Sequence, residues 1–391
     1  MIAYATDIEG RWDRLASFCT DNPAMTLEGD ALVLADGWTF VYGGDVFDRG
    51  DDGRRVARAL TAARQRYGER VVLLAGNRDI NKIRLPRELS GHPPAAAPDG
   101  LDRPALLRWV LERTMGAHAT FEHRRAELVF SGLDADDDAI VGSYFEDVAP
   151  GGAAIGYLAE CRLAWRIGGT LFVHGGIPRG AWLRMPDGAP CDGLDEWIAR
   201  LNLWLAEHLR GFQEDPLAAE PGWWPLVAYQ TPTIWVEGPG EARHRIHPTS
   251  IVYGRNVKRG NNAVLPDDDV LDGLEHAGIR RLVVGHTPNG DIPSIVRGRG
   301  GFEMIVADAS YPRSTVCPQT FLTEETTHVR GRAILEDGRE VAVEARIPDD
   351  ADVGHRTSDG WLVKGRTDSG EWMLFRFAEA YRYEQIVRTS L

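Results

Sequence analysis

The chain has 391 residues, and 43% of them are hydrophobic, which is enough apolar material for a large buried core. Lysine plus arginine number 44 against 58 aspartate plus glutamate, and the formal net charge of −14 disfavours binding to nucleic acid or to an anionic membrane surface. No apolar run approaches the roughly 18 residues of a membrane span, so we expect a folded cytoplasmic protein of enzyme size.

The N-terminal part of the chain alternates short apolar runs with one amphipathic stretch. The runs that predict strands lie at 2–6, 31–35, 38–44 and 70–76. Between the last two runs, apolar residues recur every three or four positions, at Val56, Ala59, Leu60 and Ala63. This period predicts a helix that ends at Gly68, because glycine commonly terminates helices. Polar residues that directly follow strands are typical of an α/β sandwich, where ligands gather at the carboxyl ends of strands.

The middle of the chain is less regular and predicts an insert at about 90–165 and 180–250. A Pro-rich stretch at 92–98 indicates an extended surface loop, and 194–211 has the period of a strongly amphipathic helix. The strands that resume the first pattern lie at 169–176 and 281–286. We therefore expect the sheet to continue across the insert.

From about residue 328 the sequence changes to alternating apolar and polar positions. Two such segments, 329–347 and 360–377, are each broken by a glycine-containing turn, which predicts two hairpins. We expect residues 328–391 to form a small β-rich appendage packed on a main domain of residues 1–327.

Five short polar segments follow predicted strands and carry side chains that bind divalent cations. They read TDIEG at 6–10, GGDVFDRG at 43–50, LLAGNRD at 73–79, FVHGG at 172–176 and VVGHT at 283–287. Two divalent cations about 3.5 to 4 Å apart need hard oxygen and imidazole ligands, with one carboxylate that bridges both ions. The residues that supply this mixture are Asp7, Asp45, Asn77, His174 and His286. Each segment alone is typical of a turn, and the five together predict a metal centre.

Over residues 3–310 these segments resemble the motifs of the calcineurin-like metallophosphoesterases, in particular the phosphoprotein phosphatase branch. The family pattern reads GDxHG, GDxxDRG, GNHE, HGG and a final Gly-His or Ala-His. The resemblance implies that Asp45 bridges two metal ions and that Asp7 binds one of them. The ligands that it implies for the second ion are Asn77, His174 and His286.

The same resemblance implies a fold and a phosphate ligand. The fold would be a metallophosphoesterase-type β-sandwich of mixed sheets flanked by helices, with the helical insert and the C-terminal appendage added to it. Arg49 would contact the phosphate of the substrate. The segment 302–311 is similar to a family segment in which an aspartate such as Asp308 lies near the site.

The first motif departs from the family pattern, because Glu9 stands where the family has histidine. A carboxylate oxygen also binds divalent cations, so Glu9 is a candidate metal ligand in a more anionic and harder site. The alternative is that Glu9 caps the following turn. The candidate ions are Mn, Fe, Zn and Mg, with Mn placed first.

Arg78 is a second departure, since the family has a histidine there that is thought to donate a proton to the leaving oxygen. Arginine does not donate at ordinary pH, because its pKa exceeds about 12. We expect Arg78 either to pair with Asp48 or to bind phosphate through a bidentate fork. Loss of the acid slows expulsion of a poor leaving group by about 10² to 10⁴-fold, which favours aryl esters and phosphate leaving groups. Asp48, Asp79 or a nearby histidine is a candidate replacement donor.

A third departure lies at 231–240, where related phosphatases often carry Trp-x-Arg and this chain has Trp235-Val236-Glu237. Arg255 is the best replacement as a phosphate ligand, because it belongs to a small positive island in an acidic chain. The alternative is that this island is a solvated cluster of loop charges. Lys82 and Arg84 follow a metal-ligand loop, and they either line the phosphate pocket or pair with local acids.

The resemblance implies a metal-dependent phosphomonoesterase. A water activated between two cations would attack phosphorus directly, without a covalent enzyme intermediate, on a phosphoprotein or a phosphorylated small molecule. The missing proton donor favours aryl substrates of the phosphotyrosine type. The alternatives are a nucleotide pyrophosphohydrolase of the diadenosine tetraphosphatase type and a phosphate-binding pseudoenzyme.

Overall fold

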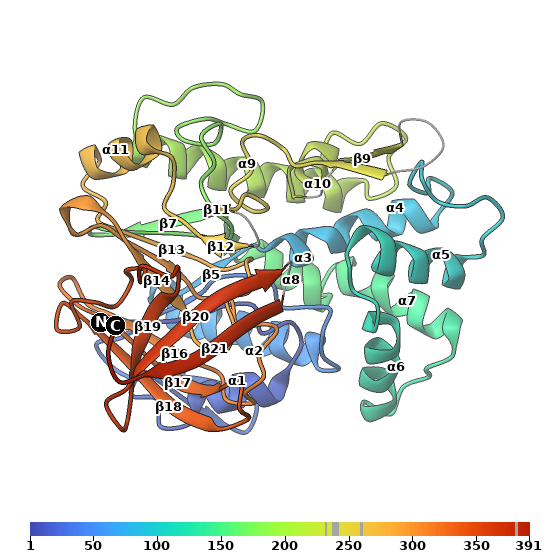
Figure 1. Cartoon of the computed structure of the whole chain (residues 1–391). Helices are drawn as coiled ribbons and strands as arrows, with labels where there is room; N and C mark the ends of the chain where they lie inside the picture. The colour runs from blue at the N-terminus through green and yellow to red at the C-terminus, as the bar shows by residue number, and fades with distance from the viewer. Residues whose placement is uncertain (231–232, 237–241, 259–260, 380–381) are drawn as a thin grey trace.

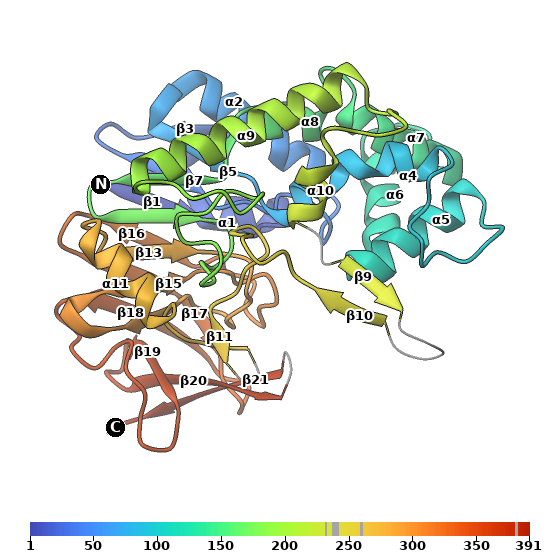
Figure 2. The same cartoon turned by 90° about the horizontal axis from the view of Figure 1, so that it is seen from above.

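A computed structural model describes residues 1–391 except for 231–232, 237–241, 259–260 and 380–381 (Figure 1). Two β-sheets pack face to face, and helices cover their outer faces (Figures 1 and 2). The predicted fold class, an α/β arrangement of mixed sheets flanked by helices, is confirmed.

The larger sheet contains ten strands among the described residues. In spatial order they are β21 (Arg382–Arg388), β20 (Trp372–Glu379), β19 (Leu362–Thr367), β18 (Glu340–Ile347), β17 (Thr327–Ile334), β16 (Gln319–Leu322), β1 (Ile2–Ala5), β4 (Thr39–Tyr42), β5 (Val71–Leu74) and β6 (Cys161–Arg162). The last four run parallel to one another, and the other pairs are antiparallel.

The smaller sheet has the spatial order β14 (Ser294–Arg297), β15 (Glu303–Val306), β13 (Arg281–Val284), β8 (Thr170–Val173) and β7 (Ala164–Ile167). Its central strand β13 runs parallel to both neighbours. Two-stranded sheets are formed by β2 (Met25–Glu28) with β3 (Ala31–Leu34), β9 (Thr233–Val236) with β10 (Ala242–Arg245), and β11 (Val257–Lys258) with β12 (Asn262–Ala263). The predicted strand at 31–35 therefore forms, but in a separate hairpin.

Side chains alternate between two apolar layers along the central strands. Tyr4 and Phe172 lie between the two sheets, where their rings stack with centroids 5.7 Å apart. Phe40 points to the opposite face of the larger sheet and packs against the outer helices. Gly43 follows β4 and His174 follows β8, and His174 Nδ1 lies 2.7 Å from Gly43 O. The carboxyl ends of strands from both sheets thus meet at one edge.

The helices that cover the larger sheet include the one predicted between the early strands. They are α1 (Trp12–Cys19), α2 (Gly53–Tyr67) and α8 (Ala153–Ala159). The apolar face of α2 is buried and Gly68 ends it with φ of +57°, as predicted. The predicted helix at 194–211 is also confirmed as α9 (Leu194–Glu214), which runs along β6 and β7. Among the described residues, no helix is both long and apolar enough to cross a membrane.

The remaining helices are α3 (Asn77–Ile80), α4 (Leu85–Leu89), α5 (Arg103–Trp109), α6 (Thr120–Phe130), α7 (Asp137–Val148), α10 (Trp224–Gln230) and α11 (Asp268–His276). Short helical turns occur at Gly68–Arg70, Asn81–Arg84, Val110–Thr114 and Arg299–Gly301. Helices α4 to α7 form a lobe with its own apolar core, at the right in Figures 1 and 2. Within the predicted insert at 90–165, α8 and β6 belong to the main layers, because α8 packs on α2 and β6 pairs with β5.

The C-terminal segment contains the two predicted hairpins, as β17–β18 and β19–β20, and a further strand β21. These strands continue the larger sheet, because β17 pairs antiparallel with β16. Gln385 of β21 is buried and bonds to the loop after β13: its Nε2 donates to Asp291 Oδ2 at 2.7 Å, and its Oε1 accepts from Asp291 N at 3.1 Å. The division between residues 327 and 328 stays a prediction, since the sheet crosses it without interruption.

Candidate active site

The loops after several parallel strands of both sheets converge at one edge. The candidate residues and the strands that they follow are Asp7 and Glu9 (β1), Asp45, Asp48 and Arg49 (β4), Asn77, Arg78 and Asp79 (β5), His174 (β8) and His286 (β13). Backbone hydrogen bonds connect these loops, since Asp7 N donates to Gly44 O at 3.0 Å and Gly285 N donates to His174 O at 2.8 Å. The structure therefore brings segments from the whole length of the main domain into one place.

Five of these residues have a positive φ, with values of 52° at Asp7, 53° at Glu9, 57° at Asp45, 98° at Asp48 and 61° at His286. Residues other than glycine rarely adopt this conformation, because it brings the side chain against the backbone. Backbone strain of this kind persists only where the surroundings hold it, and it clusters at functional sites.

Asp45, His174 and His286 form a buried cluster. Each offers one ligand atom, and these atoms lie within 4.8 Å of one another. Asn77 Oδ1 lies 3.3 Å from His174 Nε2, so a fourth donor is adjacent. Carboxylate, imidazole and amide oxygen together fit a divalent cation such as Mn²⁺, Fe²⁺ or Zn²⁺. His174 Nδ1 is directed at Gly43 O, which turns Nε2 toward the cluster.

Contact between Asp45 and His174 shifts the pKa of both side chains, whose Oδ1 and Nε2 atoms lie 3.3 Å apart. Burial alone would lower the pKa of His174, but the Asp45 carboxylate raises it to about 10. Burial alone would raise the pKa of Asp45, but His174 and Arg78 lower it. Burial and Arg255 hold the pKa of His286 well below its usual range. A cation bound here would displace the proton of His174, because a ligating imidazole is neutral.

Asp7 lies beside this cluster and contacts the loop of His286. Its carboxylate accepts hydrogen bonds from Thr6 Oγ1 at 2.5 Å and from His286 N at 3.2 Å. Burial and the nearby carboxylate of Asp308 raise the pKa of Asp7. Asp308 therefore lies near the site, as the similarity of the segment 302–311 to a family segment implies.

Glu9 and Arg78, the two departures from the family motifs, contact each other. Arg78 Nε lies 2.7 Å from Glu9 Oε1, and Arg49 Nε lies 3.2 Å from Glu9 Oε2. Arg78 Nη1 also lies 3.6 Å from Asp48 Oδ2, so of the two roles expected for Arg78 the structure contains the ion pair. Burial raises the pKa of Glu9 to about 7 against the opposing effect of the two arginines.

Asp48 and Lys82 form a second buried ion pair, with Lys82 Nζ 2.6 Å from Asp48 Oδ1 and both side chains 1% exposed. Of the two alternatives for Lys82, pairing with a local acid is the one observed. Arg84 likewise pairs with an acid, since its Nε lies 2.8 Å from Glu88 Oε1. Burial lowers the pKa of Lys82, and Asp48 opposes that effect.

The carboxylate of Asp79 is bonded to backbone rather than directed at the cluster. It accepts hydrogen bonds from Gly76 N at 2.8 Å, Asp45 N at 2.9 Å and Val46 N at 2.7 Å. Burial and the charge of Asp45 raise the pKa of Asp79 to about 7. Its position supports the shape of the Asp45 loop, and a role as proton donor stays an untested prediction.

Arg255 reaches the cluster from the segment between β10 and β11, since its Nε donates to His286 Nε2 at 3.1 Å. Two tyrosines that the sequence analysis did not single out also lie at the site. The Tyr253 ring is 4.7 Å from the His286 ring, and the Arg49 guanidinium lies 3.6 Å from the centre of the Tyr311 ring. The sequence signal that could have found these tyrosines is their nearness to Arg255 and Asp308. Residues 237–241, which include part of the third departure, lie outside the described residues.

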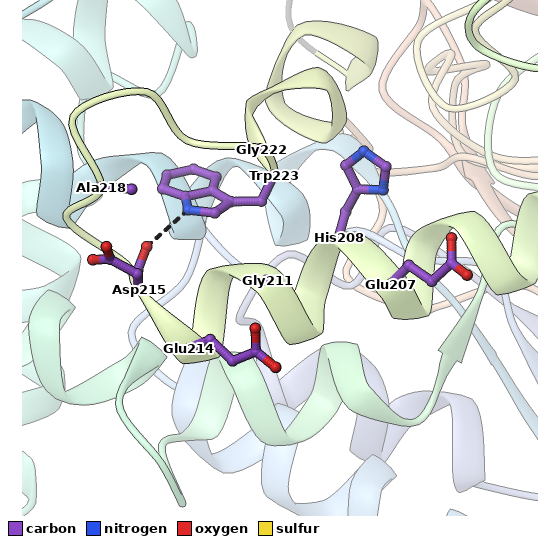
Figure 3. A pocket seen from close by; sticks show the side chains of 8 residues that line it. All are labelled: Glu207, His208, Gly211, Glu214, Asp215, Ala218, Gly222 and Trp223. Carbon is purple, nitrogen blue, oxygen red and sulfur yellow. Dashed lines mark hydrogen bonds between the residues drawn. The ribbon is translucent and has the colours of Figure 1, made fainter.

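A separate cavity of about 250 Å³ lies between the end of α9 and the loop before α10 (Figure 3). Its lining residues are Glu207, His208, Gly211, Glu214, Asp215, Ala218, Gly222 and Trp223. The indole of Trp223 donates to the backbone oxygen of Asp215 at 3.0 Å. None of the candidate residues lines this cavity, and its acidic side chains do not favour a phosphate.

No protein-family model matches the chain, and no curated protein matches it. Solved structures do match. The chain is similar to a cold-active protein-tyrosine phosphatase of the psychrophile Shewanella sp., with 17% identity and a TM-score of 0.41 over 87% of this chain and 79% of that chain.

Two further solved structures match with lower identity and a lower TM-score. A protein serine/threonine phosphatase from Saccharomyces cerevisiae, with similarity to human phosphatase PP5, matches with 13% identity and a TM-score of 0.37 over 88% of this chain and 78% of that chain. A metallophosphoesterase from Sphaerobacter thermophilus matches with 11% identity and a TM-score of 0.32 over 88% of this chain and 87% of that chain. At these scores none of the three similarities assigns a function to the chain.

Proposed function

We propose that the protein is a metal-dependent phosphoesterase that hydrolyses a phosphate monoester. The observation that carries this proposal is the buried cluster of Asp45, His174 and His286, with ligand atoms within 4.8 Å of one another. A carboxylate and two imidazoles suit a divalent cation, and guanidinium groups suit phosphate oxygens. The candidate phosphate ligands near the cluster are Arg49, Arg78 and Arg255.

When bound, a divalent cation supplies Lewis-acid activation of water and of the phosphate. The side chains of the protein have the remaining roles in this proposal. Arg255 and Arg49 neutralise phosphate oxygens from two sides, and Asn77 completes the ligand set. Arg78 keeps its charge, because Glu9 and Asp48 raise its pKa although burial alone would lower it. Arg78 therefore stabilises negative charge and transfers no proton.

The proposed substrates are aryl phosphates of the phosphotyrosine type, on a protein or on a small molecule. Such esters have good leaving groups and need little protonation. Two candidate proton donors are already engaged in other contacts, which supports this choice. Asp48 is paired with Lys82, and Asp79 is bonded to backbone N–H groups. The rings of Tyr253 and Tyr311 also supply apolar surface beside the cluster.

The same lack of a donor favours a second candidate, a nucleotide pyrophosphohydrolase, because a phosphate leaving group departs without a proton. The order of rates separates the two functions, since this candidate requires that nucleotide anhydrides react faster than aryl monoesters. Manganese as the ion and a cytoplasmic location stay predictions from the sequence.

The test is a substrate panel with Mn²⁺, Mg²⁺, Fe²⁺ or Zn²⁺ added to the chelator-treated protein. The panel contains an aryl phosphate, phosphotyrosine and phosphoserine peptides, sugar phosphates and diadenosine tetraphosphate. We expect cation-dependent hydrolysis, with aryl esters faster than alkyl esters by about 10²-fold or more.

His174→Ala should remove this activity, and His92→Ala at an exposed loop position is the matched control that should keep it. Bound cation without hydrolysis of any substrate would contradict the proposal and favour the pseudoenzyme.

A further inference from the structure

We propose that the protein binds one divalent cation per chain, and that the guanidinium of Arg78 replaces the second cation that the motif resemblance implies. The inference rests on the proposed function and concerns the same site. It explains the two departures from the family motifs, Glu9 and Arg78, as one joint replacement, because Arg78 Nε lies 2.7 Å from Glu9 Oε1.

The first step concerns Glu9, which stands at a position that the resemblance assigns to a metal ligand. Its Oε1 is bonded to Arg78 and its Oε2 lies 3.2 Å from Arg49 Nε. The Glu9 side chain is only 4% exposed. A cation at Glu9 would have to displace a buried ion pair and leave the arginines without their partner, which is costly in a low-dielectric interior.

The second step concerns Asp45, the carboxylate that bridges two cations in the resemblance. Its Oδ1 lies 3.3 Å from His174 Nε2, on the side of the histidine cluster. Its Oδ2 lies 3.6 Å from Arg78 Nε, and Oδ1 also accepts a hydrogen bond from Arg78 N at 2.9 Å. Asp45 therefore still stands between two positively charged positions, and the guanidinium already occupies one of them.

The third step concerns the ligands that remain for a second ion. Within the described part of the chain, the group of side chains with clustered ligand atoms at this edge contains Asp45, His174 and His286, and neither Asp7 nor Glu9 belongs to it. The Asp7 carboxylate is bonded to Thr6 Oγ1 and His286 N. Arg78 has a further acidic neighbour in Asp48 at 3.6 Å, so a fixed cation is well neutralised here. The residues present fit one divalent cation and do not fit a second.

The experiment is a count of bound metal. The full-length protein is stripped with chelator, reconstituted with excess Mn²⁺, freed of unbound ion and analysed by mass spectrometry for metal per chain. We expect one equivalent, and an electron paramagnetic resonance spectrum of an isolated Mn²⁺ ion. Two equivalents with a spin-coupled spectrum would overturn this inference and leave the proposed function intact. No bound metal would overturn the proposed function as well.

A double variant and its control test whether the Glu9–Arg78 ion pair is the reason that a second cation does not bind. Glu9→His with Arg78→His replaces the ion pair by two imidazoles, and we expect the double variant to bind a second equivalent of Mn²⁺. The matched control is Glu122→His with Arg108→His, an exposed ion pair of 2.6 Å in the helical lobe, which should leave the count at one.

A Glu9→Gln variant should still bind one equivalent of Mn²⁺, because Glu9 is not a ligand in this proposal. Loss of the bound Mn²⁺ in this variant would assign Glu9 to the metal and contradict the inference. The count on the unmodified protein decides the question even if the double variant does not fold.

Discussion

The two sides of Asp45 differ in how their charges are balanced. On one side His174 and His286 present uncharged ligand atoms when they are deprotonated, so a bound cation would neutralise Asp45 there. On the other side Glu9, Arg78, Asp48 and Lys82 alternate in sign, and each buried charge has an opposite charge within 3.6 Å. The two histidines follow β8 and β13 of the smaller sheet, whereas the ion-pair residues follow β1, β4 and β5 of the larger sheet. The difference agrees with the proposal that a carboxylate and a guanidinium in place of two imidazoles turn metal-ligand positions into an internal ion-pair network.

Buried charges of this kind depend on their partners. Removing one member of a buried pair leaves the other desolvated, whereas an exposed pair contributes little. The histidine side should therefore respond to substitution mainly in metal binding and activity, and the ion-pair side mainly in stability. The following predictions test that contrast.

The largest effect is expected for Asp45→Asn on the histidine side. The amide removes the charged ligand that both sides share, so hydrolysis of an aryl phosphate should fall by about 10³-fold or more. The measurement is kcat under saturating Mn²⁺, together with metal content and circular dichroism. Full activity without bound metal in this variant would refute the assignment of the cluster.

On the ion-pair side, Lys82→Met should destabilise the fold by about 3 kcal/mol, because it leaves Asp48 buried with only the longer contact to Arg78. Urea unfolding measures the change. Lys258→Met is the matched control at an exposed lysine and should change stability by less than about 0.5 kcal/mol. Equal effects of the two substitutions would show that the Asp48–Lys82 pair contributes nothing specific.

A smaller effect is expected for Arg78→His, which places an imidazole donor near the cluster. The ratio of alkyl to aryl phosphate turnover should rise by about 10 to 10²-fold, because a proton donor helps poor leaving groups most. Steady-state kcat/KM with one substrate of each type measures the ratio. An equal change for both substrates would argue against the leaving-group explanation.

The smallest effect is expected for Gln385→Leu on β21, away from the ion pairs of Glu9 and Lys82. The substitution removes the hydrogen bonds to Asp291 N and Oδ2 in the loop after His286, and should cost about 1 to 2 kcal/mol of stability. Urea unfolding is again the measurement. Because the loop still holds His286 N against Asp7, Mn²⁺ affinity should fall less than in Asp45→Asn; a complete loss of metal would show that β21 controls the histidine side.

Much of the fold follows from local pattern. The period of Val56, Ala59, Leu60 and Ala63 predicts α2, and Gly68 ends it with a positive φ. The strand runs before the five polar segments were also predicted correctly, since alternation and apolar content depend on neighbouring residues. Membership of a sheet was not predictable in the same way: β3 forms a hairpin with β2, and β17 to β21 extend the larger sheet.

The sequence alone determined which residue types directly follow each strand, because short motifs around Asp7, Asp45 and His286 contain them. Only the tertiary structure decided what Arg78 contacts, since Glu9 and Asp48 come from loops after other strands. It also decided that Asp79 bonds to backbone and that Tyr253 and Tyr311 lie at the site. The physical reason is that secondary structure depends on interactions between neighbours in the chain, whereas the partner of a buried charge depends on which distant loops fold to the same edge.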